Sequence, residues 1–319
     1  MVYHQKNGVQ IMPFFGKELY MTSIKSKKIK VFTLICLLAA VALAAVRTFM
    51  LTTIVEPDTG LYSAGTVGGY VFDVGVLLVL AVLIVVGKIL FKKHDSFCEP
   101  DSGSTVTVFG SGLCALMLFS AFLYGAYLML FAENTEGTFV HEAIVAYRTP
   151  IVLEDGKQIR NVGPIVFKGI QILMFLPCGF NHLLICAKEK REKNISHALL
   201  SMSVPVLFAL RVIDVFMSYE TQMNTSQRSL ELLMLCAMML FYMYESSFLT
   251  ERSDEAVLKP KFTNYYIAAL AVVCITCIAA VPYLLVSIFW VFESSFIVMD
   301  VLECCVMLYA ASRIVTAHD

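Results

Sequence analysis

The sequence contains few charged residues, since Asp, Glu, Lys and Arg make up only 15% of its 319 residues. Soluble domains carry about 25%. It also has no polar stretch long enough to fold as a separate soluble domain, because apolar blocks and short connectors use nearly the whole chain. The net charge of −1 gives no sign of a nucleic-acid partner. This composition excludes an ordinary soluble protein and indicates a chain whose main partner is the lipid bilayer.

Familiar catalytic motifs are missing as well. The sequence has no Gly-rich phosphate loop ending in Gly-Lys-Ser/Thr, no His-Glu-x-x-His and no Gly-x-Ser-x-Gly. Its six histidines are scattered without metal-ligand spacing. Cys274 and Cys277 have the spacing of a redox pair, but an apolar block stabilises a thiolate poorly. We therefore predict no catalytic residue, metal or cofactor, and we favour a protein that is not an enzyme.

What the chain does contain is a series of apolar blocks of about twenty residues, the length a helix needs to cross roughly 30 Å of hydrocarbon. Eight such blocks predict an all-α, polytopic transmembrane helix bundle. The predicted spans are Val31–Ile54, Val67–Phe91, Val106–Phe131, Ile165–Cys186, Ser196–Ser218, Leu230–Leu249, Phe262–Phe289 and Ser295–Ala311.

Basic residues predict the orientation of these spans, because short loops rich in Lys and Arg stay in the cytoplasm. They precede the first span, follow the second, fourth and sixth, and end with Arg313 after the last. The connector around Glu56–Gly60 and the short turn near Glu293 contain no Lys or Arg. This alternation predicts that the N-terminus and the C-terminus are both cytoplasmic.

Residues 1–28 form a predicted cytoplasmic tail, and Met21 reads as the natural start of the chain. Residues 29–315 then form a single transmembrane domain. We prefer an uncleaved first span to a signal peptide, because the apolar run continues past the possible cleavage site. The first and fifth spans end similarly, each with an Arg followed shortly by Phe-Met. This similarity is compatible with two tandem four-helix halves, 29–190 and 194–315, but we favour a chance similarity over a duplication.

The largest predicted outer connector is Ala132–Pro164. Ala143–Val152 is rich in strand-forming residues, Glu154-Asp155-Gly156 is a turn signal, and Gln158–Val162 could return as a second strand. We predict a small outer β-hairpin, with an unstructured loop as the alternative.

Charged residues inside the predicted spans are the main functional signal, because each costs roughly 2.5–3.5 kcal/mol at the centre of a span. Most fall in the outer part of their helices, which predicts one polar cavity open to the outside. Its predicted residues are Arg47, Asp73, Arg211, Asp214, Glu231, Asp300 and Glu303. A thinner inner counterpart would contain Asn181, His182 and Glu245.

Asp300 and Glu303 share one helical face, and a carboxylate without a cation in such surroundings could carry a proton. The alternative is structural pairing, in which buried ions hold helices together and Arg211 simply neutralises Asp214.

The first span has Arg47 and Thr52 near its end. Directly after them comes the segment Thr53–Tyr62, which reads Thr-Ile-Val-Glu-Pro-Asp-Thr-Gly-Leu-Tyr. It resembles a pattern in uncharacterised multi-pass membrane proteins of Gram-positive, Firmicutes-like bacteria. The resemblance implies a bacterial plasma membrane and implies no mechanism.

Three functions remain open at this point. The first is a transporter or solute-binding protein that uses the outer cavity for a small solute or a proton. The second is a membrane sensor, regulator or assembly subunit with a membrane protein partner. The third is an intramembrane enzyme that modifies lipid headgroups.

Overall fold

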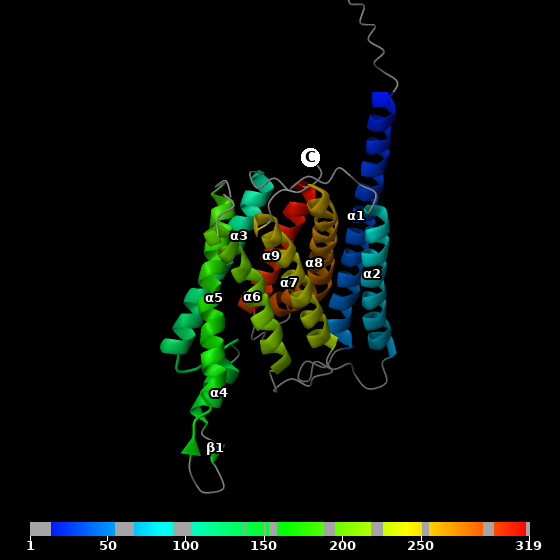
Figure 1. Ribbon diagram of the computed structural model, residues 1–319. Helices are drawn as coiled ribbons and strands as arrows, with labels where there is room; N and C mark the ends of the chain where they lie inside the picture. The colour runs from blue at the N-terminus through cyan, green and yellow to red at the C-terminus, as the bar shows by residue number, and fades with distance from the viewer. Residues whose placement is uncertain are drawn as a thin grey trace, which may run out of the picture.

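A computed structural model describes residues 14–54, 67–91, 104–136, 138–149, 151–152, 158–187, 195–217, 226–250, 255–289 and 297–316. Within these residues, each of the eight predicted apolar blocks coincides with a long helix. The long helices are α1 (Phe14–Thr53), α2 (Val67–Phe91), α3 (Thr105–Leu130), α5 (Gly163–Cys186), α6 (Ile195–Met217), α7 (Ser226–Thr250), α8 (Glu255–Phe289) and α9 (Ile297–Thr316). Figure 1 shows them side by side in one bundle.

Within the described residues, seven of these helices are long and apolar enough to cross a membrane. The chain is therefore a multi-pass membrane protein by the length and composition of its helices. The helix outside this set is α9, which carries Asp300, Glu303 and Arg313 within its 20 residues. Many large apolar side chains are exposed, especially on α1 and α2, as expected for contact with lipid.

Six helices close into a ring. α3 packs against α5 and α9, α5 against α6, α6 against α7, α7 against α8, and α8 against α9. Outside this ring, α1 packs on α8, and α2 lies beside both. α8 is the most buried candidate span because it contacts α1, α2, α7 and α9.

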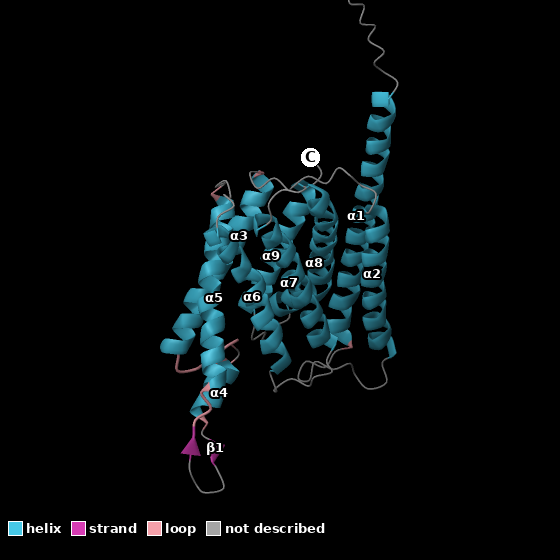
Figure 2. Ribbon diagram, in the orientation of Figure 1, coloured by secondary structure: helices cyan, strands magenta, loops and turns pink. Residues whose placement is uncertain are grey.

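The bundle has two distinct ends (Figure 1). At one end α1 begins and α9 finishes, and we call this the terminal end. The other end carries α4 (His141–Arg148) and the strands β1 (Ile151–Val152) and β2 (Gln158–Ile159), and we call it the loop end (Figure 2). α1 is 40 residues long, about 60 Å, and projects beyond the bundle at the terminal end.

The connector before α5 corrects one prediction. β1 and β2 pair antiparallel through Ile151 with Ile159 and Val152 with Gln158, and the predicted turn at 154–156 lies outside the described residues. The predicted strand over 143–148 is wrong, because these residues belong to α4. Val140, Ala143 and Ile144 recur at helical spacing and are buried, and α4 packs against α5. Burial of this apolar stripe outweighs the β-propensity of single residues.

Candidate functional site: two buried polar clusters

Five of the seven predicted cavity residues come together at the loop end, around the side chain of Arg211 on α6. Its guanidinium lies 2.9 Å from a Glu303 oxygen on α9 and 3.5 Å from a Glu231 oxygen on α7. Asp214 and Asp300 are also close enough to act on its charge. One arginine on α6 thus contacts both the next helix, α7, and the last helix, α9.

Asp214 has a different partner from the one predicted. Its carboxylate lies 2.5 Å from Nζ of Lys168 on α5, a partner that the alternative of mutual neutralisation with Arg211 did not include. The side chain of Asp214 is turned toward α5, whereas Arg211, almost one turn away, is turned toward α7 and α9. Spacing along one helix cannot decide between neighbours on two other helices.

Two basic residues complete this group. Lys168 was not among the predicted cavity residues, although its position near the start of the fourth predicted span is a detectable signal. Arg228 at the start of α7 donates a hydrogen bond to the backbone carbonyl of Val215 on α6. We call the resulting set the loop-end cluster: Lys168, Arg211, Asp214, Arg228, Glu231, Asp300 and Glu303.

Exposure within the loop-end cluster is graded. The side chains of Asp214 and Glu231 are 28% and 31% exposed, whereas those of Lys168, Arg211 and Glu303 are 8% or less. The most accessible groups are therefore acidic, and the cations lie behind them. Oδ2 of Asp300 is buried and accepts no hydrogen bond from the described part of the chain.

The remaining two predicted residues lie on the helices outside the ring. Arg47 on α1 is buried, and its guanidinium lies 5.7 Å from the centre of the Phe72 ring on α2. Asp73 is the next residue of α2 and is half-buried. Both lie on helices that pack on α8 and on each other, whereas Arg211 and its partners lie on α5, α6, α7 and α9.

The second cluster lies toward the terminal end and is larger than the sequence indicated. Glu245 on α7 accepts a hydrogen bond from the Tyr309 hydroxyl at 2.6 Å and pairs with Arg313 at 3.2 Å, both on α9. Nε of Arg313 also donates to the Tyr265 hydroxyl on α8 at 3.0 Å. Arg313 is thus buried inside α9, whereas it was predicted to follow the last span.

His182 on α5 joins the same cluster. Its Nε2 lies 3.1 Å from the Tyr242 hydroxyl on α7, and its Nδ1 lies 3.2 Å from Oγ of Ser111 on α3. The rings of Tyr242 and Tyr309 pack against the imidazole edge to face. We call this set the terminal-end cluster: Ser111, His182, Tyr242, Glu245, Tyr265, Tyr309 and Arg313.

The predicted inner set contained His182 and Glu245 but none of their partners. Tyrosine and serine inside an apolar block cost little, so hydropathy does not mark them. The burial of Arg313 could have been suspected from the sequence, because this residue lies only two positions past the end of the predicted last span.

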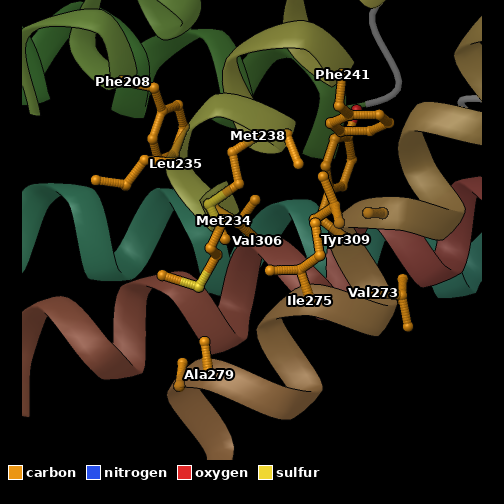
Figure 3. Packing of buried hydrophobic residues seen from close by; sticks show 14 of the residues in the cluster. Phe208, Met234, Leu235, Met238, Phe241, Val273, Ile275, Ala279, Val306 and Tyr309 are labelled. Carbon is orange, nitrogen blue, oxygen red and sulfur yellow. The ribbon is translucent and has the colours of Figure 1, made fainter. Parts of the chain in front are cut away.

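An apolar layer separates the two clusters. It consists of Leu207 on α6, Met234 and Met238 on α7, Ile275 on α8 and Val306 on α9, all 3% exposed or less. Figure 3 shows Met234, Met238, Ile275 and Val306 packed together beside Tyr309. The described residues contain no group of three or more His, Cys, Asp or Glu side chains suited to a metal ion.

Comparison with known proteins gives no family assignment, because no family model, curated protein sequence or solved structure matches the chain significantly. A functional interpretation therefore depends on the two clusters.

Proposed function

We propose that this chain is a transporter of the bacterial plasma membrane, which takes up a small solute at an outward-facing polar site together with a proton. The observation that carries the proposal is the charge balance of the loop-end cluster. Its four carboxylates, Asp214, Glu231, Asp300 and Glu303, face three cations, Lys168, Arg211 and Arg228. Carboxylates crowded into a site of low polarity do not all stay ionised, so a proton supplies the missing positive charge.

This function requires α9 to cross the membrane as an eighth span. Twenty residues reach about 30 Å, which is enough. Its charges do not prevent insertion, because Glu303 pairs with Arg211 and Arg313 pairs with Glu245 inside the bundle. With eight spans, both termini are cytoplasmic, the loop end faces outward, and α4 with a small β-hairpin covers part of that face.

Graded exposure supports the outward-facing site. A solute that arrives at the loop end meets Asp214 and Glu231 first. The guanidinium of Arg211 contacts two carboxylates, and its contact with Glu231 is longer than its contact with Glu303. Arg211 could therefore release Glu231 to a solute and keep its contact with Glu303. Arg47 and Asp73 belong to this proposal as flanking charges on the same half of the bundle.

Proteoliposomes that contain the purified protein and a lumenal pH dye test the proposal. Amino acids, amines, sugars and small carboxylic acids are added one at a time, and we expect at least one to cause proton uptake. The double substitution Asp300→Asn and Glu303→Gln should abolish this uptake because it removes both buried proton acceptors. A matched pair at the same end, Glu133→Gln and Glu136→Gln, changes two exposed residues and should leave it intact.

Unchanged uptake in a folded Asp300→Asn, Glu303→Gln protein would remove the assigned role of these carboxylates. If the unmodified protein moves no proton with any solute but copurifies with a membrane protein, the sensor or assembly role replaces transport. A changed lipid headgroup composition after deletion of the gene would instead support the enzyme.

A further inference from the structure

The hydrogen bonds of His182 select one neutral form of its ring. Ser111 has a single hydroxyl hydrogen, and that hydroxyl lies 2.7 Å from the backbone carbonyl of His182, to which it donates. Toward Nδ1, 3.2 Å away, Ser111 Oγ is therefore the acceptor, and Nδ1 carries the hydrogen. Nε2 is left with its lone pair and accepts from the Tyr242 hydroxyl at 3.1 Å.

This arrangement places a base between two hydroxyl groups in the core of the bundle. His182, Ser111 and Tyr242 are each 1% exposed or less, and they come from α5, α3 and α7. Histidine is the side chain whose charge changes most readily near neutral pH.

We infer that the terminal-end cluster is a second proton-binding site, in which His182 receives a proton from the Tyr242 hydroxyl. The Tyr242 O–H bond breaks as an N–H bond forms at Nε2, and an incoming proton restores the Tyr242 hydroxyl. The proton leaves by the reverse step: the N–H bond at Nε2 breaks, the hydrogen returns to the Tyr242 oxygen, and that oxygen gives up the hydrogen it had gained, while Nδ1 keeps its hydrogen bond to Ser111. The step moves one proton and changes no oxidation state.

The charged residues around His182 balance each other. Glu245 and Arg313 contribute one negative and one positive charge that pair with each other, so the cluster is neutral until His182 binds a proton. The Tyr309 ring lies 4.9 Å from the imidazole centre and joins it to Glu245 through its hydroxyl. The polar or titratable groups that face this region are Ser111 and Cys114 on α3, Cys178 on α5, Tyr242 and Glu245 on α7, and Tyr309 and Arg313 on α9.

This inference deepens the proposed function and depends on it, because it assigns the place where the proton leaves. On α9, Glu303 and Tyr309 lie six residues apart, about 9 Å along the helix, and on α7 Glu231 and Tyr242 lie eleven residues apart, about 16 Å. The apolar layer fills these intervals. The two proton sites are therefore separate in this structure, and a proton crosses between them only when the helices move.

The test uses the full chain in proteoliposomes, with the proton itself as the probe. A potassium diffusion potential, negative inside, drives proton uptake, which a lumenal pH dye records. We expect His182→Gln to lower the rate at least about tenfold, because glutamine can hydrogen-bond to Tyr242 but cannot take up a proton. Tyr242→Phe should lower it similarly. His141→Gln is the matched control, since His141 lies at the loop end, where its ring nitrogen is hydrogen-bonded to Thr135.

A second readout does not depend on transport. The melting temperatures of the purified unmodified protein and of His182→Gln are compared between pH 5 and pH 8. If His182 binds a proton, their difference changes by about 3 °C or more across this range. Parallel melting profiles overturn the inference, whatever the flux measurement shows.

The two readouts also separate this inference from the proposed function. Proton uptake that disappears with Asp300→Asn and Glu303→Gln but persists with His182→Gln rejects the second site and keeps the transporter. Absence of proton uptake in the unmodified protein, both with the potential alone and with each of the solutes named above, rejects the proposed proton coupling, and the melting profiles then decide alone whether His182 binds a proton.

Discussion

The contribution of a buried charged residue to the stability of this bundle depends on the partner with which it pairs. Arg211 contacts Glu303, whose side chain is 2% exposed, and Glu231, whose side chain is 31% exposed. The two contacts are not equivalent in free energy. When one partner of an exposed ion pair is removed, water solvates the remaining charge, whereas in a buried pair that charge stays without solvation.

We predict that Glu303→Gln destabilises the protein more than Glu231→Gln. The first change leaves Arg211 buried beside a neutral amide and should cost roughly 3 kcal/mol. The second removes a longer, partly exposed contact and should cost about 1 kcal/mol or less. Thermal unfolding of the two purified variants in the same detergent measures the difference. Equal losses would mean that Arg211 does not depend on Glu303.

Pairs of helices are held by both polar and close apolar contacts. At the contact of α3 with α9, Gly110 allows close approach, since a Cβ atom there would lie 3.1 Å from the backbone Cα of Tyr309. Two residues on, a Cβ atom at Gly112 would meet only the Sγ of Cys186, at 3.4 Å. Small residues at such contacts allow helices in membranes to pack closely.

Gly110→Ala should therefore push α9 away from α3 and destabilise the bundle by roughly 1–3 kcal/mol. The shift should also disturb the Tyr309 hydroxyl and its hydrogen bond to Glu245. Gly112→Ala is the matched substitution and should be nearly neutral. Thermal unfolding reports the stability of both. If Gly110→Ala behaves like Gly112→Ala, the contact of α3 with α9 is looser than described.

The ion pair between α7 and α9 allows a reversal of charge. Glu245→Arg alone or Arg313→Glu alone should leave two like charges buried and prevent accumulation of folded protein. The double exchange restores opposite charges and should recover part of the folded yield, measured by size-exclusion chromatography. No recovery would indicate that the hydrogen bonds of Tyr309 and Tyr265 require the original geometry.

The molecule as a whole has two polar clusters with an apolar layer between them, and the proposed transport function depends on this arrangement. Both clusters use α7 and α9, so a movement of either helix would affect both. The decisive whole-molecule question is whether α9 crosses the membrane.

We predict that the C-terminus lies on the cytoplasmic side, as eight spans require. A green fluorescent protein fused after Asp319 should fluoresce, and alkaline phosphatase at the same position should be inactive. The same reporters fused after Glu136, at the loop end, should give the opposite result. An active phosphatase at the C-terminus would leave seven spans and would place α9 elsewhere.

Much of the architecture was predictable from the order of residues. The apolar blocks located every long helix, because a chain in lipid must satisfy its backbone hydrogen bonds locally and a helix does so within one segment. The start of α2 at Val67 and its end at Phe91 agree with the prediction. α4 was missed, since its few buried residues gain their stability from packing on α5 and not from local propensity.

The partners of the buried charges were decided only by the tertiary structure. The amino-acid sequence by itself determined that charges such as Arg211, Asp214 and Glu303 lie inside apolar helices. It could not determine that Asp214 pairs with Lys168, or that Arg313 is buried beside Glu245. Hydropathy acts along one helix, whereas an ion pair depends on the rotation and depth of two helices that pack together. Those quantities exist only once the whole ring of helices has closed.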